Sequence, residues 1–178
     1  TTWVPPSRKQ ADLQSALVEL ASRCPDATSR DCLPDHLTAS ALVINPDATA
    51  VMLGLHGKVQ LWLQFGGHLE PVDGSLCEGA LREAKEESGV DDLVLVQSSP
   101  VQLDRHPAPC RPEARHHLDV QYLAIAPATA TPVVSSESLD VRWFAIDALP
   151  DETDDAVRRL VAVSVALMGE RSRGMTSS

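Results

Sequence analysis

Apolar residues near the start of the chain recur at the spacing of a helix. Ser7 can cap the first turn, and the apolar face that follows is formed by Leu13, Ala16, Leu17 and Leu20. This pattern predicts a helix over about residues 8–23 that packs through that face. The stretch from Cys24 to Asp35 contains two prolines and several turn formers, and we interpret it as a connector.

From Thr38 the apolar residues lose the helical period, which indicates strands. The segment ALVINPDATAVMLGL predicts two short strands around a turn at Asn45, Pro46 and Asp47, which together form a hairpin. The segment LWLQF predicts another strand, which runs into Gly66-Gly67. Four later segments have the same strand-like character: LVLVQ, VQLDR, LDVQYLAIA and VRWFAI.

A second helical pattern begins shortly after the glycine pair. The segment SLCE, residues 75–78, fits a capping box, in which the Ser75 oxygen accepts from a backbone N–H and Glu78 reaches back. Gly89 ends the helix as a C-terminal glycine does. The apolar stripe of this helix consists of Cys77, Ala80, Leu81 and Ala84. A last helix is predicted over about residues 153–168.

The elements follow the order helix, strands, helix, strands, helix. Sheet and helices should therefore share one core, in an α/β or α+β sandwich. A chain of 178 residues that is 43% hydrophobic has the size of a single domain. We expect residues 36–168 to form that domain, residues 1–35 to pack on it as a helix and connector, and residues 169–178 to be a frayed tail.

The charge of the chain limits its partners. With 25 acidic and 15 basic residues the formal net charge is −10, which disfavours binding to large nucleic acids. A small phosphorylated substrate can still bind if a divalent cation neutralises the carboxylates around it. The start TTWVPPSRKQ has no apolar signal region, and no apolar run approaches the roughly 18 residues that span a bilayer. We expect a cytoplasmic protein without a membrane segment.

The cysteines give no sign of a zinc or redox site. Cys24, Cys32, Cys77 and Cys110 form no CxxC pair and no spacing with paired histidines. We expect all four to be free thiols.

Three carboxylates carry the strongest chemical signal. Glu83, Glu86 and Glu87 are related by i,i+3 and i,i+4 spacing, so they share one helix face, away from Leu81 and Ala84. Like charges at this spacing destabilise a bare helix, and Mg²⁺ is a hard cation that prefers oxygen ligands. A metal site is one interpretation of this face. An ordinary solvated helix surface is the other.

Two neighbouring features favour the metal site. The Gly66-Gly67 pair at a strand end lets the backbone approach a ligand closely and expose a carbonyl. Arg82, next to the acidic face, can orient a carboxylate through a forked ion pair. Loop, arginine and acidic helix together predict a catalytic site.

The segment GGHLEPVDGSLCEGALREAKEESGV, residues 66–90, resembles the Nudix hydrolase family. That family's box reads G, five residues, E, seven residues, then REUxEExGU with U aliphatic, and here it matches Gly67, Asp73 and the run from Arg82 to Val90. The chain departs from the box at three points. Asp73 replaces Glu, eight residues instead of seven separate it from Arg82, and Ala84 is small for the aliphatic position.

The resemblance extends beyond the box. GGHLEPVDGSL is similar to a bacterial GGHxE-type variant with a loop one residue longer, which leaves the spacing from Arg82 to Val90 unchanged. Further similarity covers HLTASALV, WLQFGGH, HHLDVQYL and ESLDVRWFAIDALP, or most of residues 36–150.

The resemblance implies a Nudix-like α/β/α sandwich with a mixed central sheet. It also implies a pyrophosphohydrolase in which metal-assisted water attacks a nucleoside diphosphate linked to another moiety, with Mg²⁺ as the cofactor and Mn²⁺ as an alternative. The catalytic residues would be Arg82, Glu83, Glu86 and Glu87, and the metal ligands Glu83, Glu86, Glu87 and the Gly66 carbonyl. Either Glu83 or a carboxylate from a later loop would accept the proton.

Other residues are assigned by position. Glu137, six residues before Trp143, has the spacing of a later metal-site glutamate in some Nudix enzymes, although an exposed loop glutamate is equally consistent. Gly67 and His68 are the expected substrate-binding residues because they adjoin the glycine loop. His116 and His117 could contact phosphate, but their spacing is no zinc signature. The tryptophans Trp62 and Trp143 are expected as core or cleft walls.

Two other functions remain open on the same fold. A nucleotide-sensing domain that has lost catalysis would bind without hydrolysis, but its acidic face should be eroded, whereas all three glutamates are present here. An allylic diphosphate isomerase would need a cysteine and glutamate motif that none of the four cysteines provides. The sequence leaves the substrate, a homodimer and the covering role of the first helix undecided.

Overall fold

The computed structural model describes residues 3–108, 112–135 and 138–175. This part of the chain has three helices, α1 (Arg8–Arg23), α2 (Leu76–Ser88) and α3 (Asp155–Met175). Its strands are β1 (Asp35–Ile44), β2 (Ala50–His56), β3 (Trp62–Leu63), β4 (Phe65–Gly67), β5 (Val94–Leu95), β6 (Gln102–Pro107), β7 (His116–Ile125) and β8 (Ser138–Ala145). The predicted order of helices and strands is confirmed.

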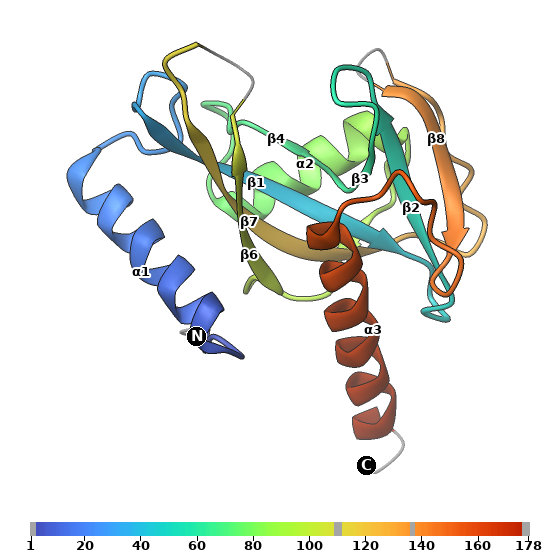
Figure 1. Cartoon of the computed structure of the whole chain (residues 1–178). Helices are drawn as coiled ribbons and strands as arrows, with labels where there is room; N and C mark the ends of the chain where they lie inside the picture. Colours follow the sequence, from blue (N-terminus) through green and yellow to red (C-terminus); the bar gives the residue numbers. More distant parts are fainter. Residues whose placement is uncertain (1–2, 109–111, 136–137, 176–178) are drawn as a thin grey trace.

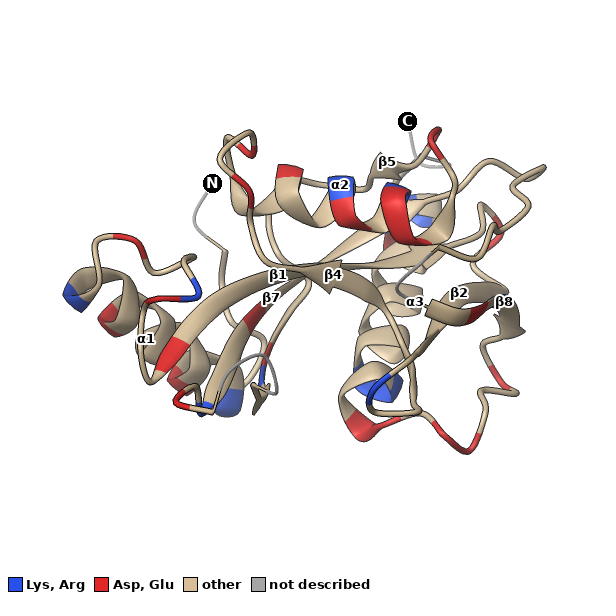
Figure 2. Ribbon diagram, turned by 90° about the horizontal axis from the view of Figure 1, so that it is seen from above, with Lys and Arg blue, Asp and Glu red and all other residues tan. Residues whose placement is uncertain are grey.

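The strands form one mixed sheet with helices on both faces. β1 and β7 run parallel through the centre, from the pair Asp35 and His116 to the pair Ile44 and Ile125, and the other pairings are antiparallel. Helices α2 and α1 lie on one face, because Ala80 of α2 packs with Ala41 and Leu20 of α1 packs on Leu37, whereas α3 lies on the other face (Figure 1, and Figure 2 from above). The α/β/α arrangement predicted from the sequence is confirmed.

Side-chain alternation along β1 sends apolar groups to both faces. Ala41 and Val43 pack in one cluster with Ala80 and Ala84 of α2, whereas the neighbouring residues Leu42 and Ile44 pack with Val157 and Leu160 of α3. A strand covered on both faces reads as a continuous apolar run, which is the pattern ALVI in the sequence. The central strands are therefore fixed in register from both sides.

Helix α1 packs on the sheet through its predicted apolar face. Leu20 is buried against Leu37 and Leu118, and the Gln10 side chain exchanges two hydrogen bonds with the Leu103 backbone, at 2.7 and 2.8 Å. The Ser7 hydroxyl accepts from Gln10 N at 3.3 Å, as the predicted cap requires. These contacts join the N-terminal helix to β6 and β7.

Two strand predictions need correction. LWLQF does not form one strand, because the chain changes partner at Gln64: β3 pairs with β2, and β4 pairs with β1. The Gln64 side chain points instead to Ser40, whose oxygen it reaches at 3.2 Å. LVLVQ contributes only the two residues of β5, because pairing to β7 is limited to Val94 and Leu95.

The last helix is longer than predicted. Helix α3 does not end near residue 168 but continues to Met175. Met168 is buried, and Arg171 Nη1 donates to the Val96 carbonyl at 3.2 Å, so the turns after Gly169 are tied to the sheet side of the molecule. Among the described residues, no helix combines the length and the apolar character needed to cross a membrane.

The cysteine prediction is wrong for two of the four residues. Cys24 and Cys32 form a disulfide, with their Cα atoms 6.3 Å apart. Turns at Ser29 and Cys32 fold the connector back on itself, so residues that are eight apart in sequence meet beside Leu20. Cys77 is a free thiol, as expected, and Cys110 lies outside the described residues.

Candidate active site

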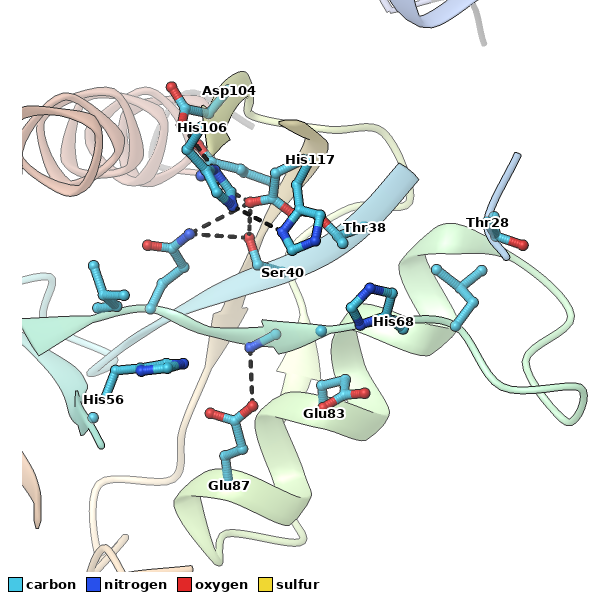
Figure 3. Close-up of a pocket in the computed structure, with 18 of the residues that line it drawn as sticks. Thr28, Thr38, Ser40, His56, His68, Glu83, Glu87, Asp104, His106 and His117 are labelled. Carbon is cyan, nitrogen blue, oxygen red and sulfur yellow. Dashed lines mark hydrogen bonds and ion pairs between the residues drawn. The ribbon is translucent and has the colours of Figure 1, made fainter. Parts of the chain in front are cut away.

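The seven site residues predicted from α2 and the glycine segment line one cavity. It has a volume of about 1320 Å³ and extends along both sides of β4, with the acidic face of α2 on one side and polar side chains of β1 and β7 on the other (Figure 3). The lining includes Gly66, Gly67, His68, Arg82, Glu83, Glu86 and Glu87. Figure 3 shows Glu83 and Glu87 rising from α2 toward the strand that leads to His68. The acidic helix face that the sequence predicts therefore forms one wall of a cavity.

Local sequence fixes how α2 presents its acidic face. The Ser75 hydroxyl accepts from Glu78 N at 3.3 Å, and Glu78 Oε2 accepts from Gly74 N at 3.0 Å, one residue before the reciprocal bond of a capping box. Gly89 ends the helix with a left-handed φ of 67°. Ala80 and Ala84 are fully buried against the sheet, and Glu83 and Glu87, on the neighbouring side of the helix, face Gly66 and Gly67 of β4.

The glycine pair is required by close packing. A Cβ on Gly66 would come within 2.5 Å of Ser40 Cα, and a Cβ on Gly67 would lie 3.1 Å from the Glu83 carboxylate. The Gly66 N–H donates to Glu87 Oε1 at 3.4 Å. The backbone of Gly66 and Gly67 thus passes between β1 and two of the carboxylates, where larger residues would not fit.

Arg82 is the hub of the charged network. Its guanidinium donates to Asp73 at 2.9 and 3.0 Å, to Glu83 at 3.1 Å, to Glu86 at 3.0 Å and to the His68 carbonyl at 3.2 Å. The hydrogen bond to Asp73, followed by the charge of Glu83, raises the pKa of Arg82 despite partial burial. One fork therefore holds two of the predicted ligands and the loop that precedes the helix.

Asp73 connects the irregular loop to Arg82. The loop is one residue longer than the box and the acid one methylene shorter, yet Asp73 reaches Arg82 and also accepts from Glu70 N at 2.8 Å. The hydrogen bond to Arg82 lowers the pKa of Asp73 below its ordinary value of 3.8. Asp73 therefore acts as the anchor of Arg82.

This anchor predicts a pH-dependent stability difference. A lowered carboxyl pKa contributes stability above about pH 3.8, and the contribution is lost as the pH falls through the folded-state pKa. Asp73→Asn is expected to lower the melting temperature by about 3–10 °C at pH 6, since hydrogen bonds to charged groups contribute roughly 1.5–3 kcal/mol. The melting curves of variant and wild type should approach each other as the pH falls below 3.8, and converge once the pH is below the folded-state pKa of Asp73.

The control is Asp91→Asn, an exposed acid after the same helix, which should melt as the wild type does at every pH. A difference between Asp73→Asn and wild type that does not shrink as the pH falls below 3.8 would show that Asp73 acts through shape and not through its charge.

A polar floor under the cavity was missed from sequence. Thr38 and Ser40 of β1 donate to the buried carboxylate of Asp119 at 2.9 and 2.6 Å, and Gln121 and Gln64 donate to the same carboxylate at 3.0 and 3.4 Å. Thr38 pairs with Asp119, and Ser40 with Gln121, in the parallel register. Polar residues at i and i+2 in otherwise apolar strands were the available signal.

Histidines occupy the other end of the cavity. His68 and His117 line it, and their rings meet edge to face with centroids 5.2 Å apart. Burial, then the charges of Arg30 and His36, lowers the pKa of His68 to about 4. Burial, then neighbouring His106, lowers the pKa of His117 to about 3. Both rings are therefore neutral at physiological pH.

Four other residues are singled out in the sequence: His116, Trp62, Trp143 and Glu137. His116 contacts Asp35 and Arg105 and does not line the cavity. Trp62 is buried edge to face with Phe144, at a centroid distance of 4.7 Å, and the Trp143 indole donates to the Ala130 carbonyl at 3.3 Å. Both tryptophans are thus packing residues. Glu137 lies outside the described residues.

Comparison with known proteins identifies similar sequences and structures. The family model described as NUDIX domain matches residues 34–163. A hydrolase of the NUDIX family from Clostridium perfringens superposes with a TM-score of 0.62 at 23% identity, covering 75% of this chain and 97% of that one. Among curated protein sequences, none matches this chain significantly.

Two further solved structures share the fold. An Ap4A hydrolase from C. elegans, in a binary complex, has a TM-score of 0.64 at 15% identity, covering 75% of this chain and 98% of that one. The dihydroneopterin triphosphate pyrophosphohydrolase from E. coli has a TM-score of 0.59 at 17% identity, covering 73% and 94%. At these low sequence identities, the similarity shows a shared fold.

Proposed function

This chain belongs to the NUDIX domain family, and from that premise we propose that it is a metal-dependent pyrophosphohydrolase. It is a Nudix hydrolase acting on phosphoanhydrides. The bond we propose it cleaves is the phosphoanhydride of a nucleoside diphosphate linked to another moiety. The observation that carries this proposal is the convergence of three carboxylates, one arginine and a glycine backbone on a single cavity.

The carboxylate end of the cavity suits a divalent cation. Nudix proteins generally use divalent metal ions, and the donors here are hard oxygens from Glu83, Glu86 and Glu87, with the Gly66 carbonyl as the proposed fourth ligand. We propose Mg²⁺, with Mn²⁺ as an alternative. When bound, the cation supplies positive charge for the phosphate oxygens and makes a water molecule more acidic.

The residues around the proposed divalent cation have different roles. Arg82 holds Glu83 and Glu86 at hydrogen-bond distance, and Glu87 accepts from Gly66 N, so the ligands are positioned before substrate arrives. Glu83, or Glu137 from the later loop, accepts the proton of the attacking water. The role of Glu137 as ligand or base rests on its sequence position.

Substrate recognition is proposed for the rest of the cavity. Gly67 and His68 lie next to the carboxylates and are proposed to contact the phosphates, while the hydroxyl and amide floor around Asp119 is suited to the polar groups of a nucleoside or sugar. A nucleotide-type substrate is typical of this family. The names of the C. elegans and E. coli proteins specify two different phosphoanhydride substrates, which supports the reaction class and leaves the leaving group open.

Domain organisation and box type are part of the same proposal. The family match covers residues 34–163, and α1 contacts β6 through the Gln10 side chain. We propose that residues 1–35 are an N-terminal addition to one Nudix domain, and that residues 66–90 are the GGHxE-type variant of the box. A homodimer and a cytoplasmic location remain predictions from the sequence.

A substrate panel tests the proposal. Nucleotide sugars, dinucleotides, ADP-ribose and nucleoside triphosphates are incubated with the protein and Mg²⁺, and every product is identified by mass. At least one compound is expected to yield two products that each carry a phosphate. Turnover should lie in the usual enzymatic range of about 1–10³ s⁻¹. Tight binding of a panel member without any product would instead identify a nucleotide-sensing domain.

A further inference from the structure

A row of histidines crosses three neighbouring strands next to the proposed active site. His36 of β1 pairs in register with His117 of β7, and His117 pairs with His106 of β6. Side chains at paired positions lie on the same face of a sheet. His68, just after β4, approaches the row, with its ring centroid 5.0 Å from that of His36 and 5.2 Å from that of His117. Segments far apart in sequence thus bring four imidazoles together.

Three of these rings point nitrogen atoms at one common volume. His36 Nε2 and His68 Nε2 are 3.0 Å apart, and one nitrogen from each of His36, His68 and His117 lies within 4.8 Å of the other two. A tetrahedral zinc ion with bonds of roughly 2.0–2.1 Å needs ligand atoms roughly 3.3 Å apart. From separations of at most 4.8 Å, the rings must therefore move closer together when an ion binds.

From this geometry we propose that His36, His68 and His117 bind a transition-metal ion of the zinc class. Neutral imidazole selects Zn²⁺ and its first-row neighbours, whereas Mg²⁺ prefers carboxylate, carbonyl and water oxygens. The two sets of ligand atoms therefore favour different cations. The glutamate oxygens favour a hard cation, and the histidine nitrogens favour a softer one. Three protein ligands leave a fourth position for water or a phosphate oxygen.

The surroundings of His117 match those of a metal-bound histidine. His117 Nδ1 lies 3.3 Å from His106 Nε2, and His106 Nδ1 lies 3.3 Å from Asp104 Oδ2 (Figure 3). Asp104 also faces Arg159 at 3.8 Å. Metal-bound histidines usually engage their second ring nitrogen in such a chain, which fixes the ring and its tautomer. His117 is oriented in this way before any ion binds.

The site is reached from the cavity. His68 and His117 line it, while His36 is completely buried behind them, so an ion bound by all three has its open position on the cavity side. Arg30 is exposed and lines the same cavity. Its charge opposes the bare cation and attracts the anionic oxygen that would complete the coordination, so it favours a phosphate as the fourth ligand.

Metal titration of the untagged protein tests this site without any measurement of turnover. Co²⁺ or Zn²⁺ is added in the presence of a large excess of Mg²⁺, which occupies oxygen ligands. One equivalent is expected to bind, seen as heat and, for Co²⁺, as the visible absorption of a tetrahedral ion. Excess Mg²⁺ should not displace it.

Substitutions identify the ligands. His68→Gln and His117→Gln are each expected to weaken Co²⁺ binding at least about 100-fold, because loss of an outer partner alone costs roughly 10- to 100-fold. His106→Gln should weaken it about tenfold. His116→Gln is the matched control, since it neighbours His117 on the same strand but faces away, and it should bind as the wild type does. His36 is left intact because its complete burial makes substitution a folding risk.

Two results would overturn the proposal. One is a wild-type protein that binds no Co²⁺ or Zn²⁺ in excess Mg²⁺, which would make the histidines a packed polar cluster. The other is binding that persists in the folded double variant His68→Gln, His117→Gln. Circular dichroism and melting curves confirm the fold of each variant, and neither result bears on hydrolysis at the glutamates.

Discussion

Replacing Glu83 or Glu87 by glutamine is expected to lower turnover by about 10²- to 10³-fold, the usual cost of removing one preorganised electrostatic group from an active site. Both carboxylates line the cavity, one beside Gly67 and the other hydrogen-bonded to Gly66 N. The change to glutamine keeps the shape of the side chain and removes its charge. Any fall in melting temperature should not exceed that of Asp73→Asn, because Glu83 accepts from the same Arg82 guanidinium and neither glutamate belongs to the apolar core.

Glu78→Gln is the matched control for this measurement. It is the same substitution on the same helix, but Glu78 caps the first turn and does not line the cavity. Its turnover should equal that of the wild type. Wild-type turnover in a folded Glu83→Gln or Glu87→Gln protein would remove that residue from the proposed site.

Removal of divalent metal is expected to reduce hydrolysis to below about 1% of its initial rate. The substrate diphosphate and the three glutamates are all anionic, and Arg82 offsets only one of these charges, so without a metal ion the substrate meets net repulsion at that end of the cavity. After EDTA treatment and dialysis, added Mg²⁺ or Mn²⁺ should restore the rate. Added zinc should not be needed for this recovery.

The metal titration also separates the roles of the ligands. For Glu86→Gln, the Mg²⁺ concentration needed for half-maximal rate should rise, because one oxygen ligand is weakened while Arg82 still holds Glu83. A metal-free protein that retains full activity would contradict both the ligand assignment and the proposed mechanism.

Helix α2 could be predicted closely because its signals are local. Ser75 caps it, Gly89 ends it, and Ala80 and Ala84 mark the buried side, so the position of the acidic face follows from a period of 3.6 residues. The same holds for the hairpin at Asn45, where the side-chain oxygen accepts from Thr49 N and Ala50 N. Each of these features lies within a few residues of its cause.

The parts that could not be predicted depend on strand register. The polar floor needs Thr38 to lie beside Asp119, and the histidine cluster needs His36 beside His117, pairs that are 81 residues apart. A single sequence shows that each strand exists without showing which residues face one another. The separation of β3 and β4 at Gln64 has the same origin, because it depends on two different partner strands.

The disulfide of the connector illustrates another limit. Cys24 and Cys32 lie in a segment whose turns, at Ser29 and Cys32, are formed by backbone hydrogen bonds. No spacing motif marks such a pair, since disulfide geometry depends on Cα separation and not on a sequence pattern. A search of the sequence for CxxC pairs therefore does not find the disulfide between Cys24 and Cys32.

The fate of the oxygen atom from water shows directly whether the protein hydrolyses a phosphoanhydride bond. The best substrate of the panel is hydrolysed in heavy-oxygen water, with Mg²⁺ present and after metal removal, and the products are analysed by mass spectrometry. A metal-dependent pyrophosphohydrolase is expected to place one heavy oxygen per turnover on a product phosphate with Mg²⁺, and to form no product without metal. Product formed with no label on phosphorus, as in an isomerisation or an elimination, would contradict the proposed function.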